Sequence, residues 1–116
     1  MRHLKKRDKL GIKYSHKKSL ISNLSNSLIK YEYLKITFVR AKVLKSFLEP
    51  IITVSKYFFN YNVRFVFKKL RNTESVLKLF KIIGPRYFFR NGGYLQIFKK
   101  GFRRGDNACL ALIKLI

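Results

Sequence analysis

The sequence carries far more positive than negative charge, and this imbalance limits what the chain can form on its own. Lysine and arginine together number 27 against 5 aspartate and glutamate residues, which gives a formal net charge of +22. A compact body with this excess repels itself, so a stable working form needs a polyanion that neutralises it. A domain that only has to stay in solution seldom needs more than about 8 net charges. Nucleic acid is therefore the first candidate partner, and an anionic membrane surface is the second.

The composition allows one folded domain. The chain has 116 residues, of which 47% are hydrophobic, with 11 phenylalanines and 7 tyrosines. This is enough for one compact core and too little for two. No stretch approaches the roughly 18 apolar residues of a membrane span. The single cysteine, Cys109, excludes an internal disulfide and fits a reducing compartment, and we interpret it as a small apolar residue in a strand.

The first 14 residues differ from the rest of the chain. They carry six cations against one acid and show no helical periodicity. Segments of this kind gain order on a partner. We therefore expect a flexible basic arm over residues 1–14 and a single globular α+β RNA-binding domain over residues 15–116.

Helical spacing of apolar residues predicts two helices in the first half of the domain. Ser15 is the expected N-cap of the first, whose inner face is expected to carry Leu20, Ile21, Leu24, Leu28 and Tyr31, with Ser22, Asn23, Ser25 and Asn26 outside. The β-rich run 34–40 follows as a strand. The second helix begins at Ala41 with an inner stripe of Leu44, Phe47, Leu48 and Ile51. Pro50 predicts a kink there or a helix boundary one residue earlier.

Two shorter helices are expected next. Residues 57–62 are interpreted as a connection and residues 63–70 as a short basic helix. Asn72 or Thr73 is the expected cap of the following helix, with Glu74 in its first turn. Its expected inner face is Leu77, Phe80 and Ile83. Gly84 and Pro85 together predict that this helix stops.

The last third of the chain predicts a hairpin. Gly92 and Gly93 mark a turn before a strand over 94–100, and the loop 101–107 separates it from a closing strand over 108–116. Gly101 and Gly105 are expected to let the loop bend, while Asp106 and Asn107 bond nearby amides. Asp106 is also expected to orient Arg103 or Arg104. The predicted fold is a two-layer α+β domain, with helices packed on one face of a small mixed sheet.

The residues that usually carry catalysis or bind metals are scattered. The acids occur singly, at Asp8, Glu32, Glu49, Glu74 and Asp106. His3 and His16 lack a Cys or acid cluster at metal-ligand spacing, and no phosphate-cradling Gly-rich loop precedes a helix. We therefore predict no enzymatic activity, no metal and no cofactor. An enzyme acting on RNA, with a site assembled from distant residues, is the third alternative after an RNA-binding and a membrane-surface protein.

The basic residues gather at two places, which favours nucleic-acid binding. The predicted RNA-binding residues are Arg2, His3, Lys5, Lys6, Arg7, His16, Lys17 and Lys18 at the N-terminal end, and Arg86, Arg90, Lys99, Lys100, Arg103 and Arg104 near the C-terminus. Arginine offers a fork of donors that matches phosphate oxygens, and lysine adds point charge. Aromatic residues lie between these cations. Most are expected in the core, and Phe102 at the loop is the best candidate for stacking on bases.

Three motifs carry a family resemblance. GPR at 84–86, RNGGY at 90–94 and GFRRGDNA at 101–108, together with MRH at 1–3, Ser15–His16 and the stretch 41–53, resemble the bacterial-type L-seventeen family of large-subunit ribosomal proteins. The resemblance covers essentially the whole chain in order. It implies an α+β two-layer fold and assembly on large-subunit ribosomal RNA beside other ribosomal proteins, near the outer end of the polypeptide exit tunnel. It implies no catalysis, no small-molecule substrate and no membrane.

The resemblance also assigns roles to residues. It places Arg2, His3, His16, Arg86, Arg90, Lys99 and Arg103 at the family's basic positions, as RNA contacts, and Gly84, Pro85, Gly92, Gly93, Tyr94, Gly105, Asp106 and Asn107 at architectural positions. The arm is richer in lysine, and residues 57–67 are more aromatic, than the family pattern. A ribosome-associated, cytoplasmic location in a bacterium follows. The bias toward Lys, Ile, Asn, Phe and Tyr also fits a reduced bacterial genome or an organelle.

Overall fold

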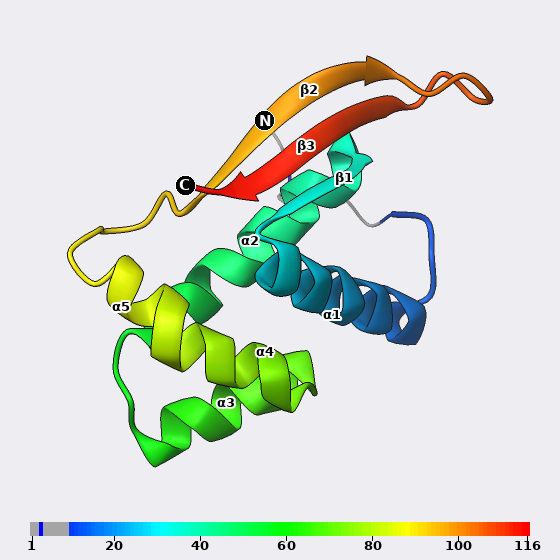
Figure 1. The fold of residues 1–116 in the computed structure, drawn as a ribbon. Helices are drawn as coiled ribbons and strands as arrows, with labels where there is room; N and C mark the ends of the chain where they lie inside the picture. Colours follow the sequence, from blue (N-terminus) through cyan, green and yellow to red (C-terminus); the bar gives the residue numbers. More distant parts are fainter. Residues whose placement is uncertain (1–2, 4–9) are drawn as a thin grey trace.

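The computed structural model describes residue 3 and residues 10–116 (Figure 1). The elements run in the order α1 (Tyr14–Tyr31), β1 (Tyr33–Thr37), α2 (Phe38–Ser55), α3 (Asn60–Leu70), α4 (Thr73–Lys78), the π-helical turn η1 (Leu79–Ile83), α5 (Gly84–Arg86), β2 (Leu95–Phe102) and β3 (Cys109–Leu115). In Figure 1 the helices lie on one side of the sheet, and the β2–β3 hairpin extends beyond them. The predicted α+β class with a C-terminal hairpin is confirmed.

The sheet has three strands in the order β1-β3-β2. β1 and β2 both pair antiparallel with β3, as in the pairs Ile36 with Ala111 and Ile97 with Ile113. The sheet that the structure describes is therefore antiparallel in both pairings, whereas a mixed sheet was predicted. Its central strand comes last in the sequence, so residues far apart in the chain meet in the layer that supports the hairpin.

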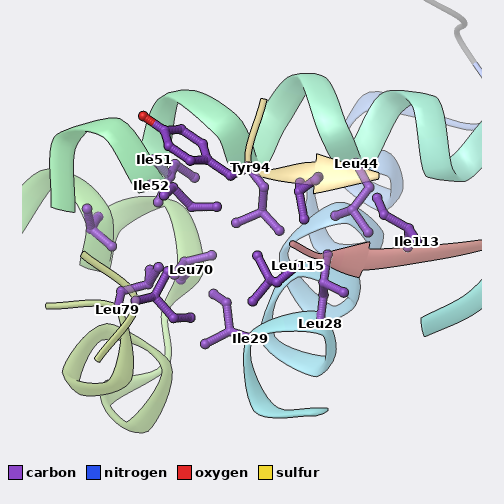
Figure 2. Packing of buried hydrophobic residues seen from close by; sticks show 14 of the residues in the cluster. Leu28, Ile29, Leu44, Ile51, Ile52, Leu70, Leu79, Tyr94, Ile113 and Leu115 are labelled. Carbon is purple, nitrogen blue, oxygen red and sulfur yellow. The ribbon is translucent and has the colours of Figure 1, made fainter. Parts of the chain in front are cut away.

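One apolar core joins the sheet to the helices (Figure 2). Leu28 and Ile29 from α1, Leu44 from α2, and Ile113 from β3 are at most 2% exposed and lie in the same cluster. Full burial of such a side chain contributes about 1.5–3 kcal/mol. Leu115 extends the cluster along β3. The inward residues of the last strand are thereby fixed against the helices.

The start of α1 and its polar stripe differ from the prediction. The N-cap is Lys13, which makes no side-chain cap hydrogen bond, so Ser15 already lies inside the helix. Ser22 and Ser25 are buried, although the sequence placed them outside. The Ser22 hydroxyl donates to the Leu70 carbonyl at 2.9 Å, and Asn26 Nδ2 donates to the same carbonyl at 3.1 Å. Because the last carbonyls of a helix lack intrahelical partners, the end of α3 draws this polar stripe inward.

Both ends of α2 also lie outside the predicted range. The strand before it ends at Thr37, so Phe38–Arg40 belong to the helix. α2 continues through Pro50 to Ser55, and the boundary predicted before that proline is wrong. α3 likewise begins at Asn60 within the predicted connection. Both helices extend beyond the apolar stripes from which they were predicted. Contacts with the rest of the fold can hold residues in a helix even where their own helix propensity is low.

In the region from Asn72 to Arg86, the predicted helix cap at Asn72 is confirmed and the predicted helix stop at Gly84 is wrong. Asn72 is the N-cap, and its Oδ1 accepts from the Ser75 N–H at 3.1 Å. The buried stripe includes Val76 and Leu79, while Leu77 is 49% exposed and not on the inner face. Helical structure continues past Gly84 to Arg86, so the predicted stop is wrong. A Cβ added to Gly84 would overlap the Ser55 carbonyl oxygen. This glycine allows close approach to α2 and does not break the helix.

Candidate nucleic-acid interface

The β2–β3 hairpin is the element that carries the predicted basic loop. Its register runs from Leu95 paired with Leu115 to Phe102 paired with Cys109. On β3, Ala111, Ile113 and Leu115 are buried against the helices. Figure 1 shows the connection between the two strands at the far end of the hairpin, away from the helical layer. The root of the loop is therefore anchored in the core while the loop itself is free to meet a partner.

A bulge precedes the loop. The register shifts between Lys99 and Gly101, which leaves Lys100 as an extra residue on β2. Gly101 has a φ of 112°, where a side chain would be strained. The predicted bending role of Gly101 is confirmed. Gly105 has no left-handed φ and no close neighbour, so the matching expectation for Gly105 is wrong.

The loop is closed by hydrogen bonds between its own residues, from both backbone and side-chain groups. The Arg103 N–H donates to the Ala108 carbonyl at 2.8 Å, and the Asn107 N–H donates to the Arg103 carbonyl at 2.9 Å. Asp106 Oδ1 accepts from the Ala108 N–H at 3.2 Å. The Arg103 guanidinium forms two bonds to Asp106, from Nε to Oδ1 at 3.0 Å and from an Nη to Oδ2 at 2.6 Å. The expected orientation of an arginine by Asp106 is confirmed for Arg103.

The contact between Arg103 and Asp106 favours the charged form of both side chains. The hydrogen bond from Arg103, with that from the Ala108 amide, lowers the pKa of Asp106 to about 2. Asp106 in turn raises the pKa of Arg103. The guanidinium has more donors than this pair uses, so Arg103 can hold a phosphate oxygen from a preset direction. Arg104 beside it is exposed, and no described residue occupies its side chain.

Further cations lie on the outer face of the sheet, where the sequence analysis did not place a site. The register puts Lys35, Leu112 and Phe98 in one row across the three strands, and Lys114 lies in the adjacent row. Lys114 Nζ is 5.3 Å from the centroid of the Phe98 ring. Strict alternation in the run 109–115 is the signal that could have shown this, because it turns Lys114 away from the buried residues on either side of it.

Arg86, which the resemblance implied as an RNA contact, forms an ion pair within the fold. Its guanidinium donates to both carboxylate oxygens of Glu32, at 2.9 and 3.0 Å. Lys78 Nζ is 3.3 Å from the same carboxylate. The Arg86 hydrogen bond, aided by Lys78, holds the pKa of Glu32 below its ordinary value. Arg86 therefore joins α5 to the end of α1, although part of its surface remains open.

The other predicted contacts near the C-terminus are divided between two places. Arg90 Nε donates to the Gly93 carbonyl at 3.2 Å, which holds it at the turn before β2. Lys99 Nζ lies 4.8 Å from the centroid of the Phe38 ring, on the helical side of the hairpin. Lys100 is exposed at the bulge. The hairpin thus brings together Lys99, Lys100, Arg103 and Arg104, and leaves Arg86 and Arg90 at its opposite end.

At the N-terminal end, His16 and Lys18 are exposed in the first turns of α1 and Lys17 is half-buried. His3 is exposed as well. Arg2, Lys5, Lys6 and Arg7 lie outside the described residues, as does most of the predicted arm. Tyr14, which was assigned to the arm, lies in α1. The start of α1 and the hairpin loop both lie toward the right-hand side of Figure 1, with α5 toward the left.

Within residue 3 and residues 10–116, no three His, Cys, Asp or Glu side chains gather where they could hold a metal ion. None of the helices described in this range is both long and apolar enough to cross a membrane. The candidate interface combines the arginine loop of the hairpin with lysines and aromatic rings on the sheet.

The comparisons with known proteins agree with the resemblance carried by the glycine-rich motifs. The family described as Ribosomal protein L17 matches residues 20–116. The chain is also 47% identical over 114 residues to the large ribosomal subunit protein bL17 of Wigglesworthia glossinidia brevipalpis, covering 98% of this chain and 93% of the relative. With a family match over most of its length and a relative this similar, the chain belongs to the ribosomal protein L17 family.

Proposed function

We propose that this protein is a structural constituent of the large ribosomal subunit that binds and stabilises large-subunit ribosomal RNA. The observation that carries the proposal is the β2–β3 loop, in which Asp106 fixes Arg103 and leaves Arg104 exposed on an anchored hairpin. The name of the relative bL17 places that protein in the large subunit. Family membership supports the same assembly here, at the ribosome in the bacterial cytoplasm.

The proposed binding is electrostatic and shaped by the fold. The described residues contain 22 of the lysines and arginines and four acids, so the folded part alone is strongly basic. Phosphate contacts release counterions and fix the position of the protein, while base contacts add specificity. The hairpin supplies a rigid contact, and residues 1–14 supply an arm that enters folded RNA. Neighbouring ribosomal proteins and a location near the outer end of the exit tunnel complete the proposal, on the strength of the family resemblance.

The loop is tested by Arg103→Ala combined with Arg104→Ala. The matched control is Lys30→Ala combined with Lys81→Ala, which removes the same charge from two exposed positions on the helices. We expect the loop variant to bind large-subunit ribosomal RNA more weakly and to reduce the magnitude of the salt slope by about 1 to 2, because each lost phosphate contact contributes about 0.9. An unchanged affinity and slope, or an equal effect in the control, would show that the loop is not a phosphate contact.

The assembly itself is tested by sedimentation of cell extracts at moderate salt. The protein is expected to travel with large ribosomal subunits. If it occurs wholly in the membrane fraction, the ribosomal proposal is wrong and the membrane-surface alternative replaces it.

A further inference from the structure

The outer surface of α3 combines aromatic rings with cations in a regular order. Tyr61, Arg64, Phe65 and Lys68 follow the spacing i, i+3, i+4, i+7, which places them along one side of the helix. All four are exposed, with Tyr61 at 69% and Phe65 at 43%. Val66 and Leu70 occupy the opposite side and are at most 1% exposed. The core of the protein therefore does not use the two rings.

The rings on this surface are already arranged as flat faces. Phe59, immediately before α3, stacks on Tyr61 with ring centroids 5.6 Å apart and an interplanar angle of 3°. Lys69 Nζ lies 5.7 Å from the centroid of the Phe65 ring. Parallel stacking holds the Tyr61 ring in one orientation, and Tyr61 and Phe65 lie about one helical turn apart. A partner with planar groups would meet two separate π surfaces here.

The positive charge around the two rings favours a negatively charged partner. Residues 57–71 contain the cations Arg64, Lys68, Lys69 and Arg71 and no acid. A second copy of the chain docked on this surface would bring these cations against one another. Exposed aromatic groups of this extent mark an interaction site, and aromatic rings that alternate with cations suit a polyanion whose planar bases are accessible. Duplex RNA hides its bases, whereas an unpaired strand exposes them.

We propose that the outer surface of α3 binds an unpaired segment of RNA. Bases stack on Tyr61 and Phe65, and the phosphates between them contact Arg64 and Lys68. The proposal rests on the proposed function, since ribosomal RNA supplies the strand. The site is separate from the hairpin, because α3 and the hairpin loop lie toward opposite ends of the molecule in Figure 1. One protein would then hold two parts of the RNA, by phosphates at the loop and by stacked bases at α3.

The absence of tryptophan from the sequence provides a direct probe of stacking. In a Tyr61→Trp variant of the full chain, the introduced indole is the only one present. A 12-nucleotide oligoadenylate is expected to quench its fluorescence, because a base stacks on the ring. A 12-base-pair RNA duplex is expected to bind the protein and leave the fluorescence unchanged. Quenching by both RNAs alike, by neither, or only by phosphatidylglycerol vesicles would overturn the proposal.

An affinity measurement completes the test. Tyr61→Ser combined with Phe65→Ser is expected to weaken binding of the oligoadenylate about 10- to 100-fold, as expected for lost base stacking. The salt slope and the affinity for the duplex are expected to stay the same. The matched control, Tyr31→Ser combined with Phe89→Ser, removes two other exposed rings and is expected to change the affinity less than about 2-fold. An equal loss in the control, or an equal loss for the duplex, would contradict the proposed site.

The result is distinguishable from failure of the proposed function. If the protein is not a ribosomal RNA-binding constituent, the wild type fails to sediment with large subunits and shows no preference for ribosomal RNA. If only the α3 proposal is wrong, the wild type does both, and the Tyr61→Ser and Phe65→Ser changes leave the binding of unpaired RNA intact.

Discussion

Among the described residues, two arginine–carboxylate pairs have nearly the same geometry and different surroundings. Arg86 and Glu32 are 54 residues apart in the chain and join with two bonds of 2.9 and 3.0 Å. Arg103 and Asp106 are three residues apart and join with two bonds of 3.0 and 2.6 Å. The hydrogen-bond geometry does not distinguish the two pairs. Their roles are distinguished by the elements that each pair connects.

The first pair is part of the fold and the second is part of a surface. The Glu32 N–H donates to the Leu28 carbonyl at 2.7 Å, and its own carbonyl accepts from the Leu115 N–H at 2.9 Å. Glu32 thus links α1, β3 and α5. The second pair lies in an exposed loop, and its side-chain hydrogen bonds join residues of that loop. We conclude that the same chemistry connects distant elements of the fold where it spans the chain, and shapes an exposed loop where it stays local.

The largest difference in stability between the two regions is expected when one glycine is replaced in each. Gly84→Ala is expected to lower the free energy of unfolding by about 2 kcal/mol, because the added methyl group overlaps the backbone oxygen of Ser55. The matched change, Gly105→Ala in the loop, has open space around it and is expected to stay within about 0.5 kcal/mol of wild type. Urea unfolding followed by circular dichroism measures both. Equal stability of the two variants would contradict the distinction.

A smaller loss of stability is expected from Glu32→Gln, which leaves Arg86 and Lys78 close together without their shared carboxylate. Because the pair is partly open to solvent, we expect a loss of about 1 kcal/mol near neutral pH. The folded pKa of Glu32 lies below its ordinary value of 4.5, so this contribution is present above that pH and disappears as the pH falls through the folded pKa.

The stability difference between the wild type and Glu32→Gln should therefore depend on pH. The difference between their unfolding free energies is expected to shrink on going below pH 4.5, where the wild-type carboxylate begins to take up a proton. A difference that stays constant down to strongly acidic pH would mean that the ion pair does not stabilise the fold.

The smallest effect on stability is expected from Asp106→Asn, which changes an exposed loop. The unfolding free energy is expected to stay close to that of the wild type, because surface substitutions of this kind change stability little. The freed Arg103 adds charge toward any RNA and loses its fixed direction, so the preference for ribosomal RNA over an unrelated RNA is expected to fall about 3-fold or more. Competition binding at one salt concentration measures this ratio. An unchanged ratio would show that the orientation of Arg103 does not contribute to recognition.

The parts of the fold that could be predicted are those fixed by local chemistry. The Asn72 cap, the left-handed glycines at positions 92 and 93, and the glycine at the bulge follow from the conformations that these residues adopt. The loop closure by Asp106 was also available from the sequence, because a short acidic side chain bonds amides near it. The family resemblance rested in part on the motifs that contain Gly92, Gly93, Gly101 and Asp106.

The parts that could not be predicted depend on distant neighbours. Ser22 is buried because the end of α3 needs donors, and nothing near Ser22 in the sequence indicates this. Gly84 has the local pattern of a helix stop, and the neighbouring helix α2 gives it another function. The ion pair of Arg86 with Glu32 was not predicted either, because the two residues are 54 positions apart in the sequence. The surface of α3 was recognised only as a departure in composition.

The position of β3 in the middle of the sheet also has a consequence for synthesis. β1 is made early, and its partner in the described sheet is β3, through pairs such as Ile36 with Ala111. Contacts this distant form late in folding because a long loop must first close. Until the ribosome has made residues 109–115, β1 lacks the strand that it joins in the described sheet. Formation of this sheet therefore has to wait until β3 has been made.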